Sequence, residues 1–151
     1  MTEEEIYLGT KIGLLKRGFK IMAGQPPRGT DSLPVIEIKS GEHTNKGSYR
    51  SYKPDLVCYD GINIYIIECK PNYNYPDVCK LLSVKNSPLR ISMFYNELEK
   101  RGLFEKFNIP AAPNTFADLL KFCIAYSGTK VENPDVDHII VSDMQGDIAI
   151  G

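Results

Sequence analysis

Residues 53–71 read KPDLVCYDGINIYIIECKP, and this stretch decides how the chain folds. Two apolar runs, LVCY and INIYII, flank Asp60-Gly61, a dipeptide typical of the turn of a β-hairpin. Each run has a carboxylate at the end away from the turn, Asp55 before the first run and Glu68 after the second. A buried carboxylate is costly unless another charge or hydrogen bonds compensate it, so these two side chains need a partner.

The length of the hairpin loop determines which residues face each other. With a two-residue loop Asp55 faces Ile66 and has Glu68 as its diagonal neighbour, and with a four-residue loop Asp55 faces Glu68 directly. Lys70 points to the same side as Glu68 because side chains alternate along a strand. Both registers place Asp55, Glu68 and Lys70 on one face, whereas a three-residue loop requires a bulge to do so.

Two carboxylates on one face repel each other, and a divalent cation between them turns the repulsion into attraction. Mg²⁺ suits such a site because it binds one or two carboxylates and keeps positions for water and phosphate oxygens. A nearby lysine can hold an attacking water, lower its pKa, or balance the charge that develops at phosphorus. Asp55, Glu68 and Lys70 are therefore typical of a site that cleaves phosphodiesters. The simpler alternative is a salt bridge of Lys70 with one of the acids at the rim of a sheet.

A second acid-x-Lys pattern, Glu37-Ile38-Lys39, indicates how specific the first one is. A pattern this short arises about once by chance in a chain of ordinary composition and this length. No Pro-Asp precedes the second copy at hairpin distance, so we expect ordinary strand residues with solvent-facing charges there. Residues 54–70 differ because Pro-Asp, a tight turn and an apolar strand ending in Glu-x-Lys occur together.

Composition and charge limit the class of protein. The chain has 151 residues, of which 25% are charged and 42% hydrophobic, as in an ordinary globular domain. No apolar run approaches the roughly 20 residues that cross a bilayer, and the first residues, MTEEEIYLG, lack the pattern of a signal peptide. We therefore expect a cytoplasmic protein without a membrane partner. Four cysteines without a CxxC pair and two isolated histidines favour buried thiols over a zinc site.

The net charge of −1 argues against binding nucleic acid by bulk electrostatic attraction. The charge is unevenly distributed, because between residues 39 and 90 Lys and Arg outnumber Asp and Glu by three. A solvated charged face explains this bias, and it favours a phosphate-bearing partner only slightly.

The spacing of apolar residues and turn residues predicts an α/β (α+β) domain, with a mixed central sheet flanked by helices. Helices are expected over 3–17, from the cap Asn74 to about 85, from Ser87 to Gly102, and over 115–127 with Asn114 as the cap. Besides the hairpin, extended segments are expected over 19–24, 33–40, 137–143 and 147–150.

On Pro54-Asp55, twelve residues, and then Glu68-Cys69-Lys70, the chain resembles the PD-(D/E)xK nuclease superfamily, which has the restriction-endonuclease-like fold. The resemblance covers roughly residues 3–85 and one late strand. It implies an αβββαβ core with the motif on the second and third strands. It also implies Mg²⁺-dependent cleavage of phosphodiesters, usually in DNA, with Mn²⁺ able to substitute.

The resemblance also implies roles for single residues. Asp55 and Glu68 would be catalytic metal ligands, with the backbone carbonyl of Cys69 as a third ligand. Lys70 would be the catalytic lysine that orients or activates the attacking water.

Many members of the superfamily add a metal-facing glutamate from the first helix. Glu3, Glu4 and Glu5 are the candidates, and Glu5 is preferred because Ile12 and Leu15 lie near its side of the helix. An acidic first helical turn explains all three glutamates equally well.

Contact with DNA is expected through the segment KPNYNYPDVCKLL and through basic side chains around the hairpin. The nucleic-acid-binding candidates are Arg50, Lys53, Lys80 and Lys85.

The type of nuclease stays open at this stage. The superfamily branch with Gln-x-x-x-Tyr on the helix after the motif is disfavoured, because the glutamines are Gln25 and Gln145. Archaeal Holliday-junction resolvases have a similar opening helix that ends in Gly-Phe but are usually more basic, and a restriction-type or repair-type enzyme fits equally. Cutting both strands usually needs two active sites, so we expect a homodimer or a partner subunit.

Residues 1–151 are expected to form a single nuclease-like domain. Because the sequence ends inside an apolar strand-like run, DIAIG, the nuclease domain of a longer protein is a further expectation. Two alternatives remain: a non-catalytic module of the same fold that binds nucleic acid or a partner chain, and an unrelated α/β domain in which the motif is accidental.

Overall fold

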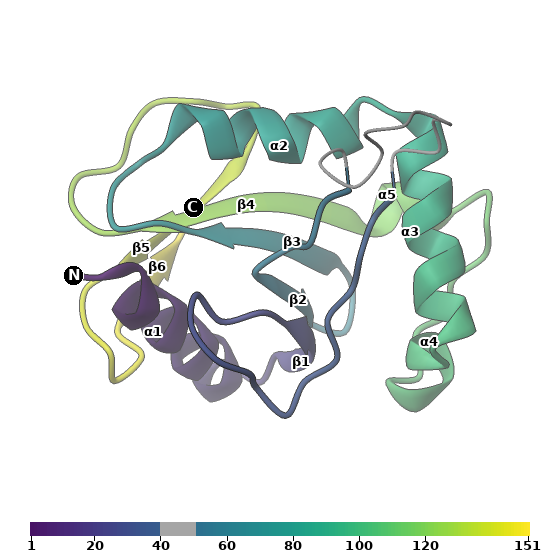
Figure 1. The fold of residues 1–151 in the computed structure, drawn as a ribbon, viewed down its shortest axis with the longest axis horizontal. Helices are drawn as coiled ribbons and strands as arrows, with labels where there is room; N and C mark the ends of the chain where they lie inside the picture. The colour runs from purple at the N-terminus through teal and green to yellow at the C-terminus, as the bar shows by residue number, and fades with distance from the viewer. Residues whose placement is uncertain (40–50) are drawn as a thin grey trace.

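Six strands form one mixed sheet whose spatial order follows the sequence (Figure 1). The structure is a computed structural model, and it describes residues 1–39 and 51–151. β2 is antiparallel to both of its neighbours, β3, β4 and β5 are mutually parallel, and β6 returns antiparallel to β5. The strands are β1 Lys20–Gly24, β2 Leu56–Tyr59, β3 Ile64–Cys69, β4 Leu120–Tyr126, β5 Asp137–Val141 and β6 Ile148–Ile150.

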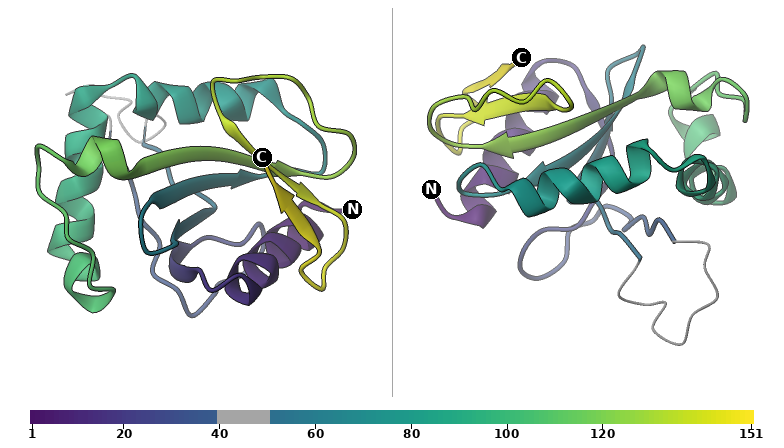
Figure 2. Two further views of the ribbon diagram at one scale, coloured as in Figure 1. Left: turned by 180° about the vertical axis from the view of Figure 1, so that it is seen from behind. Right: turned by 90° about the horizontal axis from the view of Figure 1, so that it is seen from above.

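Helices cover both faces of this sheet. α1 lies on one face, and α2 and α3 lie on the other (Figures 1 and 2). The expected α+β class, a mixed sheet flanked by helices, is therefore confirmed. The helices are α1 Glu3–Lys16, α2 Tyr75–Lys85 and α3 Pro88–Lys100, with the single turns α4 Leu103–Lys106 and α5 Phe116–Leu119.

Each long helix begins at a capping residue, of which Asn74 and Ser87 were expected from the sequence and Thr2 was not. The Thr2 side chain accepts a hydrogen bond from the Glu5 N–H, and Glu5 caps the Thr2 N–H in return. Asn74 and Ser87 cap α2 and α3, and each of these helices has a proline in its first turn. Because the caps fix where α1 and α2 start, they also fix the position of the acidic residues in their first turns.

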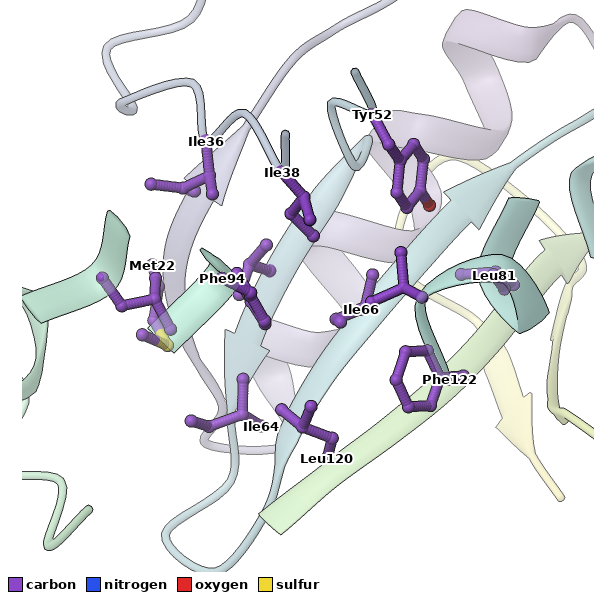
Figure 3. Packing of buried hydrophobic residues seen from close by; sticks show 14 of the residues in the cluster. Met22, Ile36, Ile38, Tyr52, Ile64, Ile66, Leu81, Phe94, Leu120 and Phe122 are labelled. Carbon is purple, nitrogen blue, oxygen red and sulfur yellow. The ribbon is translucent and has the colours of Figure 1, made fainter. Parts of the chain in front are cut away.

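The hydrophobic core consists of two layers, one on each face of the sheet. Because side chains alternate along β3, Ile64 and Ile66 pack on the α2 side, whereas Ile67 packs on the α1 side. Figure 3 shows the α2-side layer, into which Ile64, Ile66 and Tyr52 point. Glu68 continues the series of Ile64 and Ile66, so its carboxyl group belongs to this same face.

α1 approaches the turn between β5 and β6 closely because glycines stand at the contact. A Cβ atom on Gly9 would lie 2.3 Å from the carbonyl oxygen of Asp143, and a Cβ atom on Gly13 would lie 2.8 Å from the Ile148 side chain. This close contact fixes α1 across the sheet and places its N-terminus, with Glu3, at the end of β3.

Two sequence predictions about elements are wrong. Residues 115–127 form not one helix but the single turn α5 followed by β4, a strand buried on both faces between two parallel neighbours. Such a strand is apolar almost throughout, and its sequence therefore resembles that of a buried helix. The segment 33–40 is not a strand of the sheet either, since its described part makes only the isolated bridge of Ile38 with Tyr52.

Three of the four cysteines are buried in the sheet. Cys58, Cys69 and Cys123 are buried free thiols, as expected, whereas Cys79 is exposed. Within residues 1–39 and 51–151, no helix is long and apolar enough to cross a membrane.

Candidate active site

A four-residue loop, 60–63, joins β2 and β3 and sets the register of the hairpin. Tyr59 pairs with Ile64 and Leu56 with Ile67, so the next step of the same register places Asp55 opposite Glu68. Of the two registers that bring the acids together, the four-residue loop is therefore the correct one.

Hydrogen bonds of the Asp60 side chain hold this loop. Its Oδ1 accepts hydrogen bonds from the backbone N–H groups of Ile62 at 2.8 Å and Asn63 at 2.6 Å, and its Oδ2 accepts one from the Tyr65 hydroxyl at 2.9 Å. The turn residue thus determines which side chains meet at the other end of the hairpin.

The backbone fixes Asp55 and Lys70 at the ends of their strands. The Asp55 carbonyl accepts a hydrogen bond from the Gln25 N–H at 2.9 Å, which ties it to the end of β1. The Lys70 N–H donates to the Ala125 carbonyl on β4 at 3.0 Å. The site therefore lies where the carboxyl end of β3 meets both neighbouring strands.

Asp55 and Glu68 form a pair of facing carboxyl groups. Burial raises the pKa of Glu68 well above its usual range, and the hydrogen bond and charge of Asp55 raise it further. Burial also raises the pKa of Asp55. Hydrogen bonds with Glu68 and with the Cys69 N–H, which donates to Asp55 at 2.8 Å, lower this pKa but do not outweigh burial. Without a cation the two groups therefore retain a proton between them, because ionising both would place two charges side by side.

Two further buried side-chain oxygens, the Tyr52 hydroxyl and Oδ2 of Asp77, lie near this pair. Among the described residues, Oδ2 of Asp77 is buried without a hydrogen-bond partner. Both lie close enough to Glu68 for their charges to interact, and burial together with Glu68 raises the pKa of Tyr52. Buried polar atoms are normally hydrogen-bonded, whereas Oδ2 of Asp77 has only the ion-pair contact with Lys70 at 3.7 Å.

Lys70 is held between acids from two different helices. Its Nζ lies 2.8 Å from Oε1 of Glu3 on α1 and 3.7 Å from Oδ2 of Asp77 on α2. The hydrogen bond with Glu3 raises the pKa of Lys70, and burial lowers it. The negative charges of Asp77 and Asp55 also raise the pKa, so the net shift is upward. Lys70 is thus an ammonium group that can donate hydrogen bonds next to the carboxyl pair.

The first-helix glutamate beside this lysine is Glu3. Glu5, the preferred candidate, caps α1 instead of contacting Lys70, and its role as a metal-facing residue stays a prediction. The Glu5 carboxylate lies near the Thr2 N–H, with Oε1 at 3.4 Å, and completes the capping box of α1. A glutamate at the third helical position is the usual partner of a threonine cap. The Thr2 and Glu5 spacing in the sequence therefore indicates that Glu5 caps the helix.

Cys69 contributes backbone rather than thiol to the site. Its side chain is buried in the α1-side layer, and its N–H donates to Asp55. The role of its carbonyl as a metal ligand stays a prediction.

The four predicted nucleic-acid-binding residues do not all lie near the carboxyl pair. Lys53 is exposed next to the site, and Lys80 is mostly exposed on α2 and lies 3.2 Å from Oδ1 of Asp77. Lys85 is at the far end of α2, where it donates to the Asp135 carbonyl, so it is remote from the carboxyl pair. Arg50 lies outside the described residues.

Asp77 and Tyr52 also lie at the site, and the sequence alone does not indicate this. Asp77 was assigned only to the start of α2, where an acid is common, and its burial depends on the way α2 packs over the sheet. Tyr52 follows the segment 40–50 and reaches Glu68 through the bridge with Ile38, a contact that no local pattern predicts.

The side chains of the carboxyl pair suit a hard divalent cation. Within the described residues, no group of three or more His, Cys, Asp or Glu side chains forms a ready-made metal cage. Mg²⁺ needs fewer protein ligands, since it keeps several waters and binds one or two carboxylates. Asp55 and Glu68 offer two facing carboxyl groups whose shared proton such an ion would replace, so they fit it.

Comparison of the chain with protein-family models, curated proteins and solved structures found no match.

Proposed function

We propose that this chain is a metal-dependent endonuclease that hydrolyses phosphodiester bonds in DNA. The observation that carries the proposal is the hairpin register, which sets Asp55 opposite Glu68, with Lys70 on the same face two residues further on. Facing acids with an adjacent ammonium group are costly in a sheet that has only to fold, and they suit a site that must bind a cation and a phosphate.

The arrangement of elements also supports the proposal. The elements α1, β1, β2, β3, α2 and β4 follow the order of an αβββαβ core once the single turns, α3 and the last two strands are set aside. The motif residues stand where β2 begins and where β3 ends. The restriction-endonuclease-like core is accordingly part of the proposal.

Asp55 and Glu68 would hold Mg²⁺ or Mn²⁺, with the Cys69 carbonyl as a third ligand. When bound, the cation supplies positive charge to a phosphate oxygen and favours ionisation of the attacking water. To hold the cation, the carboxyl pair would release its shared proton to solvent.

Lys70 acts in this mechanism as a donor. Its contact with Glu3 at 2.8 Å keeps the ammonium group charged, so it can orient the attacking water or balance the charge that develops on the phosphate. The proton of the attacking water then goes to solvent or to a phosphate oxygen rather than to Lys70.

The resemblance and the charges near the site support DNA as the substrate. Lys53 and Lys80 are exposed beside the carboxyl pair and can contact phosphates. Lys85 lies at the opposite end of α2, so a DNA contact there would be to a phosphate away from the carboxyl pair.

The proposal is tested by incubating the protein with duplex, single-stranded and branched DNA in Mg²⁺, Mn²⁺ or EDTA. We expect cutting that requires a metal and falls by about 10²- to 10⁴-fold in Lys70→Ala. The matched control is Lys39→Ala, which removes the lysine of the second Glu-x-Lys pattern and should cut like the wild type.

Either of two results would contradict the proposal. Equal cutting by Lys70→Ala and the wild type would remove Lys70 from the site. DNA binding without cutting in either metal would favour a non-catalytic binding module of the same fold.

A further inference from the structure

The charges around the carboxyl pair point to a role for Asp77. A divalent cation between Asp55 and Glu68 would balance those two acids and leave a second group of charges, two carboxylates and two ammonium groups, with no net charge. This second group consists of Glu3, Asp77, Lys70 and Lys80. Asp77 is therefore better explained as a partner of lysine than as a ligand of a second cation.

The surroundings of Asp77 are unusual for an acid at the start of a helix. Its side chain is only 4% exposed, and Oδ2 has no hydrogen-bond partner. An exposed acid would interact with the helix dipole just as favourably, without the cost of burial. The burial of Asp77 is consequently not required by α2, which Asn74 already caps.

The unpartnered oxygen of Asp77 faces the ammonium group of Lys70. The separation is 3.7 Å, which is an ion pair without a hydrogen bond, and the shorter contact of Lys70 is with Glu3 at 2.8 Å. α1 and α2 cover opposite faces of the sheet, so the two acids attract Lys70 from opposite sides (Figure 2). A lysine side chain has many rotamers, and a single partner on α1 would leave it free to turn away from the sheet.

We propose that Asp77 is a positioning residue that holds the ammonium group of Lys70 over the Asp55–Glu68 pair. This inference deepens the proposed function and rests on it. The buried carboxylate attracts Lys70 toward the α2 side, where Glu68 also lies, and the missing hydrogen bond leaves Lys70 free to donate to water or phosphate.

The test is a double-mutant cycle with Asp77→Asn and Lys70→Ala, read out by the single-turnover rate of DNA cutting. We expect Asp77→Asn to slow cutting by about 10- to 100-fold, the effect of a misplaced catalytic group. In the Lys70→Ala background the same change should alter the rate by less than about twofold, because the residue it positions is gone. Affinity for DNA in EDTA and for Mn²⁺ should stay within about twofold of the wild type in Asp77→Asn.

The control is Glu97→Gln, which breaks a comparable ion pair on α3, where Glu97 lies 2.8 Å from Arg101. It should leave the cutting rate unchanged. Asp77→Ala serves as a second variant without charge, and thermal unfolding verifies that each variant is folded.

Any of the following results would contradict the proposal. Equal slowing in both backgrounds, or none, would show that Asp77 does not act through Lys70. Weakened Mn²⁺ binding would make Asp77 a metal ligand, and unfolding of both variants would make it a structural residue. A wild-type protein that cuts no DNA would remove the proposed function together with this inference, whereas a cutting wild type with an equally active Asp77→Asn overturns the inference alone.

Discussion

Burial and a facing carboxyl group both disfavour the ionised form of Glu68. The side chain is 4% exposed and continues the series of Ile64 and Ile66 on the α2-side face of β3. An apolar residue at this position would stabilise the metal-free sheet, so a glutamate here indicates a requirement of function rather than of folding.

The pKa of Glu68 predicts how the stability of the metal-free protein changes with pH. Because the pKa is raised in the folded state, the folded protein binds this proton more tightly than the unfolded chain does. The resulting stabilisation is complete below the pKa of an unfolded glutamate, about 4.3, and is lost as the pH rises toward the raised value. Stability in EDTA should therefore fall between about pH 4.3 and the folded pKa of about 10.

Glu68→Gln cannot lose this proton and should flatten the decline. We expect its melting temperature in EDTA to exceed that of the wild type by about 3–6 °C at pH 8, and the two to converge near pH 5. Thermal unfolding followed by circular dichroism over this pH range makes the comparison. Parallel curves for the two proteins would show that Glu68 is ionised in the folded state.

At the scale of elements, the hairpin loop controls the site from its far end. The Asp60 carboxylate binds two backbone N–H groups and the Tyr65 hydroxyl, and a four-residue loop is what places Asp55 opposite Glu68. Partial burial raises the pKa of Asp60, but the hydrogen bonds outweigh this effect and leave the pKa below its usual range. Its contribution to stability is thus present above the pKa of an unfolded aspartate and is lost as the pH falls through the folded pKa.

Asp60→Ala should destabilise the protein by about 1–3 kcal/mol at pH 7, because several hydrogen bonds to a charged acceptor are lost. The difference from the wild type should shrink below about pH 4, where Asp60 is protonated in the unfolded chain. Urea unfolding at both pH values measures this, with Asp118→Ala on the single turn α5 as a control for removing an acid. A loss of stability that is independent of pH would contradict the role assigned to the carboxylate.

Features set by neighbouring residues in the sequence were predicted correctly, whereas features set by packing between distant segments were not. Asp60-Gly61, Asn74 and Ser87 act on their near neighbours, and the hairpin and the two helix starts were predicted from them. β4 was mistaken for a helix because it is buried by both neighbouring strands, and that burial is a property of the whole sheet.

The candidate site divides in the same way. Asp55, Glu68 and Lys70 lie in one hairpin, so alternation along the strands was sufficient to place them on one face. Glu3 and Asp77 reach the site because α1 and α2 pack on opposite faces of the sheet, and no local pattern determines that contact.

At the scale of the whole molecule, the proposed activity requires Asp55 and Glu68 to hold one divalent cation jointly. The most direct test is Mn²⁺ binding, measured by calorimetry or by the loss of the free-ion paramagnetic resonance signal, in the wild type, Asp55→Asn and the control Glu37→Gln. We predict one ion per chain in the wild type and in Glu37→Gln, and binding weakened by about tenfold or more in Asp55→Asn. Equal affinity in all three proteins, or no binding at millimolar Mn²⁺, would show that Asp55 and Glu68 do not hold a divalent cation.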